Sequence, residues 1–304
     1  MEVVSTAQRI ILTGATGFVG LNVQKYLKEN YEINSLSVRY IPTQSFKLIG
    51  DVIIHLAGKA HDLKKISNPS DYYEANFELT KQLFNSFLKS EASVFIFMST
   101  VKAVADEVVG VLTEEHISKP KTHYGIAKHQ AEEFILSQTL PLGKRVYILR
   151  PCMIHGPGNK GNLNLLYQLV SKGLPWPLGA FKNKRSFLSI ENLCFVINEL
   201  LQNAAIPSGI YNVADDESLS TNDLIELLGQ SLGKRNRTIK ISQSLIKKLA
   251  AVGDVLNLPL NSERLQKLTE NYVVSNEKIK MVLGKDLPVS SRKGLITTFT
   301  SFKN

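Results

Sequence analysis

A glycine-rich turn between a short apolar run and an amphipathic segment constrains the fold of this chain more than any other feature. Residues 9–13 are mostly apolar, the turn occupies residues 14–20, and apolar side chains then recur at helical spacing as far as Leu27. This order is typical of a strand, a tight turn and a helix. Glycines let the backbone approach a pyrophosphate closely, and the amides at the helix start favour its negative charge. The alternative is a turn that binds nothing, but the order favours a pyrophosphate site with contacts from Gly14, Gly17 and Gly20. Thr16, Phe18 and Val19 of the same turn are also expected to bind the cofactor.

Short apolar runs alternate with longer amphipathic segments through the first half of the chain. Helical spacing is clear at residues 71–89, and strands are expected at residues 9–13, 34–38, 51–57, 93–99 and 146–150. Parallel strands joined by helical crossovers have this pattern. We therefore expect an α/β fold with a doubly wound parallel sheet of the Rossmann type.

The pattern changes after residue 151, where glycine and proline gather, and helical spacing returns at residues 220–232 and 244–256. We expect a dinucleotide-binding domain over residues 1–157 and a smaller, mostly helical substrate-binding lobe over residues 158–304. Part of residues 187–212 is expected to pack back onto the first domain.

The end of the second expected strand indicates which dinucleotide the turn would hold. NAD-binding chains usually carry an acidic residue there for the adenosine ribose hydroxyls. Residues 35–39 read Ser-Leu-Ser-Val-Arg and contain no Asp or Glu. Because a guanidinium can donate two hydrogen bonds to a 2′-phosphate, Arg39 favours NADP(H), while NAD(H) stays open. The alternative is that Arg39 is an ordinary surface charge.

Tyr124 and Lys128 stand four residues apart at the start of an amphipathic segment, so they share one face of the expected helix. A phenol has a pKa of about 10, but a neighbouring ammonium stabilises the phenolate and lowers that pKa. Tyr124 could then exchange a proton with a sugar hydroxyl or ketone. Ser99 and Thr100 end the preceding strand, at the edge where doubly wound sheets bind ligands. One of these hydroxyls is expected to complete the hydrogen bonds around the reacting oxygen.

Together these motifs resemble those of the extended short-chain dehydrogenase/reductase family, whose members include nucleotide-sugar epimerases, dehydratases and 4-ketoreductases. The likeness includes residues 55–58, 73–76 and 150–158 and extends along nearly the whole chain. It implies an acid–base pair of Tyr124 and Lys128, with Thr100 as the catalytic hydroxyl. It also implies cofactor contacts from Leu56, Ala57, Gly58, Asn76, Ser99, Tyr124, Lys128 and Pro151.

Motifs in the second half resemble the branch of this family that acts on C4 of UDP-N-acetyl sugars. These motifs are residues 156–163, 177–179 and 185–193. An asparagine and an arginine in them would lie at the diphosphate of the substrate, and a later arginine would do the same or be a surface residue. The implied substrate-binding residues are Thr100, Tyr124, Asn162, Arg185 and Arg264.

Three features depart from the family pattern. Only residues 39–50 separate the second expected strand from the next apolar run, so the usual third strand and its crossover are shortened or missing, which affects the adenine pocket. His155 and Val104 stand where many relatives have tyrosine. Met153 stands where some epimerases carry an asparagine that contacts the substrate, which disfavours simple 4-epimerisation.

Composition disfavours other classes of protein. No run reaches the roughly 18 apolar residues of a membrane-spanning helix, and the first ten residues do not resemble a secretion signal, so we expect a cytoplasmic protein without membrane insertion. The histidines and cysteines lack metal-ligand spacing, so we expect no metal.

The net charge of +9 lies in the last quarter of the chain. Residues 231–304 hold 14 Lys and Arg and 5 Asp and Glu, whereas residues 1–230 hold 22 of each kind. The excess is either a solvated surface or a field that attracts a diphosphate. Since the basic residues are not interleaved with aromatic ones, we expect no nucleic-acid partner.

Three functions stay open. The leading one is hydride transfer from a nicotinamide to C4 of a UDP-4-keto-(N-acetyl)hexose in glycan biosynthesis, with Tyr124 protonating the product. The second is a UDP-sugar 4-epimerase that uses bound NAD. The third, a non-catalytic dinucleotide sensor, is disfavoured because Tyr124, Lys128 and Thr100 occur together. The resemblance also allows a homodimer.

Overall fold

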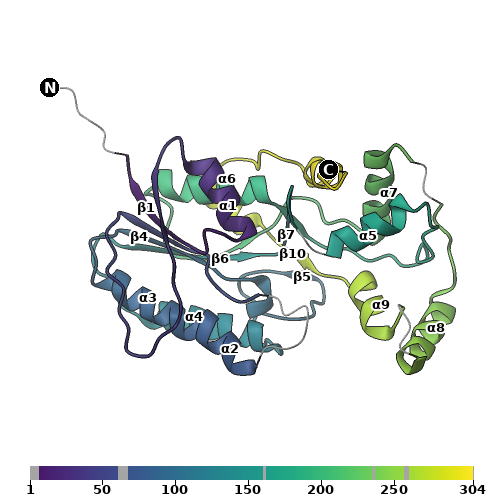
Figure 1. Ribbon diagram of the computed structural model, residues 1–304, viewed down its shortest axis with the longest axis horizontal. Helices are drawn as coiled ribbons and strands as arrows, with labels where there is room; N and C mark the ends of the chain where they lie inside the picture. The colour runs from purple at the N-terminus through teal and green to yellow at the C-terminus, as the bar shows by residue number, and fades with distance from the viewer. Residues whose placement is uncertain (1–6, 61–67, 160–161, 235–236, 257–259, 304) are drawn as a thin grey trace.

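The computed structural model describes residues 7–60, 68–159, 162–234, 237–256 and 260–303, and a six-stranded sheet lies at its centre (Figure 1). The strand order is β2-β1-β3-β4-β6-β9, and every neighbouring pair is parallel. This confirms the doubly wound parallel sheet. The strands are β1 (Arg9–Thr13), β2 (Glu32–Leu36), β3 (Val52–His55), β4 (Val94–Met98), β6 (Arg145–Pro151) and β9 (Gly209–Val213).

Helices cover both faces of the sheet, because the side chains of each strand point alternately to the two faces. One face packs on α1 (Phe18–Leu27) and α6 (Ile190–Gln202) through strand residues such as Ile10, Leu12, Ile54 and Ile96. The other face packs on α3 (Leu79–Leu88) and α4 (His123–Ser137) through Ile11, Ile53 and Phe95. Figure 1 shows these two helix layers on opposite sides of the strands. Burial of both faces explains why the inner strands are almost continuously apolar.

Two expected elements differ from the structure in their composition or in their position along the chain. The helix expected at residues 71–89 consists of α2 (Pro69–Tyr73), one π-helical turn (Glu74–Glu78) and α3. The strand expected at residues 34–38 lies two residues earlier, at β2. This strand forms the sheet edge and pairs only with β1, and its mostly exposed side chains give no apolar pattern that would fix its ends.

No strand or helix lies between β2 and β3, where every residue is described. The segment instead runs along α3, where the Phe46 amide donates to Ser86 Oγ at 3.0 Å. Gln82 Nε2 also donates to the Ile41 carbonyl at 2.7 Å, and Leu48 is buried beneath the same helix. The expected loss of the usual third strand is therefore confirmed.

A second group of helices forms the other end of the molecule (Figure 1). The helices expected at residues 220–232 and 244–256 are confirmed as α7 and α8. Two short parallel pairs join this group to the end of the sheet: β7 (Met153–His155) with β8 (Phe187–Ser189), and β5 (Val111–Leu112) with β10 (Val273–Val274). The helices after β7 and β9 are α5 (Asn162–Ser171), α7 (Thr221–Leu232), α8 (Gln243–Leu256), α9 (Ser262–Thr269), α10 (Glu277–Leu283) and α11 (Ser291–Ser301).

Helix α6 and strand β9 follow β8 in the sequence but lie at the central sheet. Helix α6 packs beside α1, and β9 pairs with β6. The division into domains at residue 157 stays a prediction. Within the described ranges, no helix is long and apolar enough to cross a membrane.

Candidate active site

In the glycine turn after β1, the backbone at Gly14 lies close to the backbone at Ala57, and Gly20 lies close to Gly14. Gly14 has a φ of +70°, and a Cβ there would lie 2.7 Å from the Ala57 nitrogen. A Cβ on Gly20 would overlap the Gly14 carbonyl. The Gly17 amide donates to that carbonyl at 3.1 Å, and α1 then begins at Phe18 without a side-chain cap. The amides at this helix start face no capping side chain, so the turn fits the pyrophosphate of a dinucleotide.

Hydrogen bonds hold the residues after β3 against this turn. The Leu56 amide donates to the Thr13 carbonyl at 3.3 Å, and the Ala57 amide donates to Thr13 Oγ1 at 3.2 Å. The same hydroxyl lies 2.8 Å from His55 Nδ1, and His55 Nε2 lies 3.0 Å from Thr80 Oγ1. Burial lowers the pKa of His55 to about 3, so the imidazole is neutral. The buried His55 side chain therefore connects β1 and β3 to α3 by hydrogen bonds with Thr13 and Thr80.

Asn76 connects the same segment to the π-helical turn. Its Nδ2 donates to the Lys59 carbonyl and its Oδ1 accepts from the Lys59 amide, both at 3.0 Å. A Cβ on Gly58 would lie 2.6 Å from Asn76 Oδ1 and 3.3 Å from Lys128 Nζ. The backbone at Gly58 therefore passes closely between these two side chains. This brings the predicted cofactor residues 56–58 and Asn76 together with Lys128.

Tyr124, Lys128 and Thr100 lie at the carboxyl end of β4. The Thr100 hydroxyl hydrogen-bonds the Tyr124 phenol. The Thr122 hydroxyl caps α4, so Tyr124 lies in the first turn of that helix. Lys128 lies one turn later, and its Nζ donates to the Met98 carbonyl at 2.8 Å. The structure thus brings the three predicted catalytic residues to one edge of the sheet.

The pKa values of the pair differ from the expectation. Burial raises the pKa of Tyr124 to about 12, against the opposing effect of the hydrogen bond with Thr100. Burial lowers the pKa of Lys128 to about 7, against the opposing charge of Glu132. The expected lowering of the phenol pKa is not found, because desolvation of the phenolate dominates and the ammonium donates to Met98. Tyr124 is protonated at neutral pH, which is the form that can donate a proton.

A buried charge network behind the pair is absent from the sequence predictions. Glu132 accepts from Nε of Arg150 at 2.9 Å, from its Nη2, and from the Ser99 hydroxyl. Burial raises the pKa of Glu132, but the hydrogen bond from Arg150 and the other partners outweigh it, so the net shift is downward. The network joins α4 to the ends of β4 and β6. The signal that could have found it is the four-residue spacing that continues from Tyr124 and Lys128 to Glu132.

The residues implied for the substrate diphosphate lie on the helical end of the molecule. Arg185 Nη1 donates to the Lys267 carbonyl in α9, and its Nη2 lies 3.4 Å from Glu270 Oε1. Arg264 is exposed about one turn earlier on the same helix. Asn162 begins α5, and its side chain lies outside the described part of the structure.

Lys102 and Tyr272 connect Arg185 to Thr100, the predicted catalytic hydroxyl. The Lys102 amide donates to Thr100 Oγ1 at 3.2 Å, and the Lys102 ammonium lies 4.3 Å from the centre of the Tyr272 ring. The Tyr272 hydroxyl donates to the Ala105 carbonyl at 2.7 Å. Tyr272 also forms a β-bridge with Arg185. The proposed phosphate arginine and Thr100 are therefore joined by two packed residues.

Arg39 lies three residues beyond the end of β2. Because Leu36 pairs with Thr13 of β1, this segment leaves the sheet beside the glycine turn. Arg39 is exposed there, as is Thr16 in the turn, while Val19 is half-buried in α1.

Three positions that depart from the family pattern lie in packed parts of the structure. Val104 is fully buried, and Met153 packs on the helices of the far end. His155 is buried, with its Nδ1 2.9 Å from Thr298 Oγ1 of α11. Pro151, a predicted cofactor residue, is buried at the end of β6.

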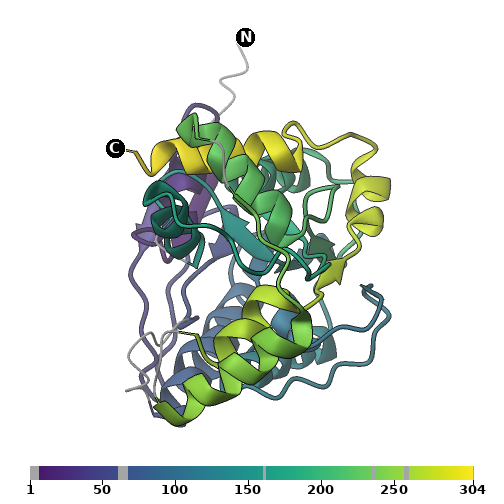
Figure 2. The ribbon, with the colours of Figure 1, turned by 90° about the vertical axis from the view of Figure 1, so that its right-hand side faces the viewer.

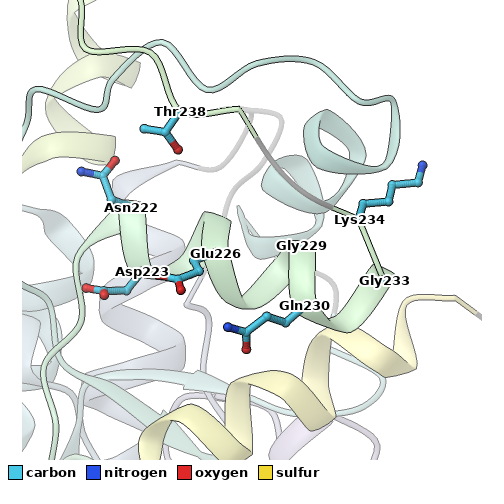
Figure 3. Close-up of a pocket in the computed structure, with 8 residues that line it drawn as sticks. All are labelled: Asn222, Asp223, Glu226, Gly229, Gln230, Gly233, Lys234 and Thr238. Atoms are coloured by element: carbon cyan, nitrogen blue, oxygen red, sulfur yellow. The ribbon is translucent and has the colours of Figure 1, made fainter.

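A pocket of about 570 Å³ lies over α7 (Figure 3). No predicted site residue lines it. The lining residues are Asn222, Asp223, Glu226, Gly229, Gln230, Gly233, Lys234 and Thr238.

Replacing Gly14 with Ala is expected to weaken dinucleotide binding at least about tenfold, or roughly 1.4 kcal/mol. The new Cβ would overlap the backbone at Ala57, so the turn would have to move. Gly143→Ala is the matched control, because Gly143 also has a positive φ (+83°) but open space around it. Fluorescence titration with NADPH measures both affinities, and equal affinities in the two variants would contradict this function of the turn.

Known proteins resemble this chain in sequence and in fold. The model of the NAD dependent epimerase/dehydratase family matches residues 10–214. The UDP-glucose 4-epimerase of Vibrio cholerae is 30% identical over 96% of this chain and 95% of its own length. The N-acetyl-alpha-D-glucosaminyl-diphospho-ditrans,octacis-undecaprenol 4-epimerase of Escherichia coli O157:H7 is 29% identical over 74% of this chain and 73% of its own length. The structure of RMD from Pseudomonas aeruginosa complexed with NADPH has the same fold, with a TM-score of 0.70 at 21% identity over 97% of this chain and 98% of that chain. The chain belongs to the NAD-dependent epimerase/dehydratase family.

Proposed function

We propose that this protein is an NAD(P)-dependent oxidoreductase that reduces C4 of a UDP-4-keto-(N-acetyl)hexose in glycan biosynthesis. The observation that carries the proposal is the protonated phenol of Tyr124, hydrogen-bonded to Thr100 and one helical turn from Lys128. A reductase needs a proton donor at the carbonyl oxygen, and a phenol with a pKa of about 12 holds its proton until that oxygen gains charge.

Each residue then has a defined task. The bound dinucleotide supplies the hydride that C4 accepts. Thr100 hydrogen-bonds the C4 oxygen, and Tyr124 donates its proton to this oxygen as negative charge develops. Lys128 binds the nicotinamide ribose and, when charged, favours the phenolate that Tyr124 leaves behind. The turn at Gly14 and Gly17 holds the pyrophosphate.

The substrate diphosphate is assigned to the helical end of the molecule. Arg185 is anchored there by the Lys267 carbonyl and by Glu270, and Arg264 lies on the same helix α9. Asn162 completes the proposed set at the start of α5. Guanidinium groups bind phosphate through paired hydrogen bonds, which suits both arginines to this task.

NADP(H) is the proposed cofactor. Arg39 leaves the sheet beside the glycine turn, and the P. aeruginosa relative of the same fold was solved with NADPH. Replacing Arg39 with Ala is expected to lower kcat/KM for NADPH at least about tenfold, because a charge-assisted contact to the 2′-phosphate is lost. The value for NADH should stay within about threefold of the wild type, as should both values in the control Arg237→Ala. A parallel loss with both cofactors would contradict the assignment.

The function is tested with a panel of UDP-4-keto-sugars and both nicotinamide cofactors. Consumption of NADPH with at least one UDP-4-keto-hexose is the expected result. The panel includes the 4-keto form of a polyprenyl-diphosphate sugar, since the E. coli relative is named for a polyprenyl-diphosphate sugar. If neither cofactor is consumed with any member of the panel, the reductase assignment is wrong.

A UDP-sugar 4-epimerase is the second candidate, and the V. cholerae relative favours it by its 30% identity over nearly the whole chain. An epimerase returns the hydride to the same carbon, so it needs the same three catalytic residues. Recovery of tightly bound NAD from the purified protein, with interconversion of two UDP-sugars and no net redox change, would identify this activity. Homodimer formation and a cytoplasmic location stay predictions.

A further inference from the structure

Helix α8 carries an exposed apolar stripe beside its packed face. Its buried residues are Ile246, Ala250 and Gly253. A Cβ on Gly253 would overlap the Leu260 carbonyl, which lies just before α9. On its outer side, apolar residues are between 49% and 81% exposed: Leu245, Leu249, Val252, Val255 and Leu256.

The spacing of these residues makes a continuous surface. Leu245, Leu249, Val252 and Leu256 follow one another at intervals of four, three and four residues, so they line one side of the helix. Isolated apolar residues on a protein surface are ordinary, but an aligned set on one helix marks an interaction surface. Lys248 lies beside the stripe, next to Leu249 in sequence.

The hairpin of α8 and α9 that carries the stripe has a positive net charge. Residues 243–269 hold four Lys and Arg and two Asp and Glu. Asp254 accepts from the Ser262 amide at 2.9 Å and from its hydroxyl, and Glu263 pairs with Lys267 at 2.6 Å. Both acidic side chains are thus engaged on the α8–α9 hairpin itself, and Lys247 and Lys248 of α8 are exposed.

The hairpin lies at the end of the molecule farthest from the sheet (Figure 1), and Figure 2, which looks at that end, shows α8 across its outer surface. It also adjoins the proposed diphosphate site, since Arg185 donates to the Lys267 carbonyl of α9 and α8 packs on α9. If a flat partner bound to α8, the central sheet would therefore lie on the side of the protein that faces away from this partner.

We propose that α8 docks the protein onto an anionic phospholipid bilayer. The 14 residues of α8 extend about 21 Å, too short to span a membrane but suited to lying in its surface. The apolar stripe would enter the boundary between headgroups and acyl chains, and the surrounding lysines and arginines would contact lipid phosphates. A second copy of the chain fits less well, because the two basic surfaces would repel each other. The inference is independent of the reaction at C4.

Co-sedimentation of the full chain with vesicles tests the proposal. We expect binding to vesicles that contain phosphatidylglycerol, weaker binding to pure phosphatidylcholine, and release by salt. The double variant Leu249→Glu, Val252→Glu should lower the partition coefficient about a hundredfold, because two apolar side chains no longer enter the bilayer. The control variant Leu142→Glu, Met281→Glu carries the same charge change at exposed apolar positions elsewhere and should bind within about threefold of the wild type.

Three results would overturn the proposal. The wild type could stay in the supernatant with phosphatidylglycerol vesicles, or the Leu249→Glu, Val252→Glu variant could bind as well as the wild type. Analytical ultracentrifugation could instead show a dimer that this variant dissociates, with no vesicle binding, which would assign the stripe to a second copy. Turnover of a water-soluble substrate should be the same in the wild type and both variants, so this experiment and the test of the C4 reaction can fail separately.

Discussion

Replacing Tyr124 with Phe is expected to reduce turnover of a UDP-4-keto-hexose with NADPH at least about a hundredfold. The ring would keep its packing in α4, but the proton donor and its hydrogen bond with Thr100 would be lost. Because the phenol acts on the reacting oxygen, the loss should fall on kcat and leave dinucleotide affinity within about threefold of the wild type. Steady-state kinetics and a NADPH titration measure the two quantities.

The matched control is Tyr73→Phe. The Tyr73 hydroxyl lies 3.3 Å from Nδ1 of His123, the residue before Tyr124 in α4, so the control removes a nearby phenol hydroxyl outside the proposed chemistry. We expect its turnover to stay within about threefold of the wild type. Unchanged turnover in Tyr124→Phe, or an equal loss in both variants, would remove Tyr124 from the role of proton donor.

Replacing Glu132 with Gln is expected to lower the free energy of unfolding by about 3–5 kcal/mol. The substitution keeps the shape of the side chain but leaves the Arg150 guanidinium, which is 3% exposed, without its counter-charge. Since the net pKa shift of Glu132 is downward, its stabilising effect is present above the usual glutamate pKa and is lost as pH falls through the lower folded value. Urea denaturation at neutral pH measures the change.

Two further variants separate the ion pair from a general effect on α4. Glu133→Gln changes the next residue, whose side chain is 66% exposed, and should alter stability by no more than about 0.5 kcal/mol. Glu132→Gln combined with Arg150→Met should be less destabilised than Glu132→Gln alone, because no unpaired buried charge remains. A double variant that is less stable than the single one would show that an unpaired Arg150 charge is not the cause of the loss in Glu132→Gln.

The Glu132 network also links stability to the site. Its carboxylate holds the Ser99 hydroxyl directly before Thr100, and it lies one turn beyond Lys128 on α4. Glu132 therefore holds residues on both sides of the proposed catalytic arrangement, through the Ser99 hydroxyl and through its place on α4.

Much of the fold follows from the sequence because the inner strands are buried on both faces. The apolar runs at residues 52–55 and 94–98 stand out for this reason, and the expected strands there differ from β3 and β4 by only one or two residues at each end. The edge strand β2 is mostly exposed, so its ends are poorly marked. Strand β9 is not among the strands expected from the sequence; it follows α6 after a short connection, and only three of its five residues are buried.

In the candidate site, too, some features can be predicted from the sequence and others cannot. The glycine turn and the Tyr124–Lys128 spacing are local features, so the sequence reveals them directly. The Met98 carbonyl that binds Lys128 lies 30 residues earlier, and Arg150 lies 18 residues after Glu132. Such contacts depend on how strands are ordered in the sheet. The direction of the Tyr124 pKa shift also depends on burial, which spacing alone does not give.

The most direct test of the account follows the hydride itself. The protein is incubated with a UDP-4-keto-hexose and NADPH that carries deuterium at both hydrogen positions of the nicotinamide C4, and the product is analysed by NMR. We predict deuterium on C4 of the sugar, transferred to one face of that carbon, with wild-type protein and a much slower transfer with Tyr124→Phe. Oxidised nicotinamide and a reduced sugar without deuterium at C4, or no reaction of any UDP-4-keto-hexose, would contradict the account.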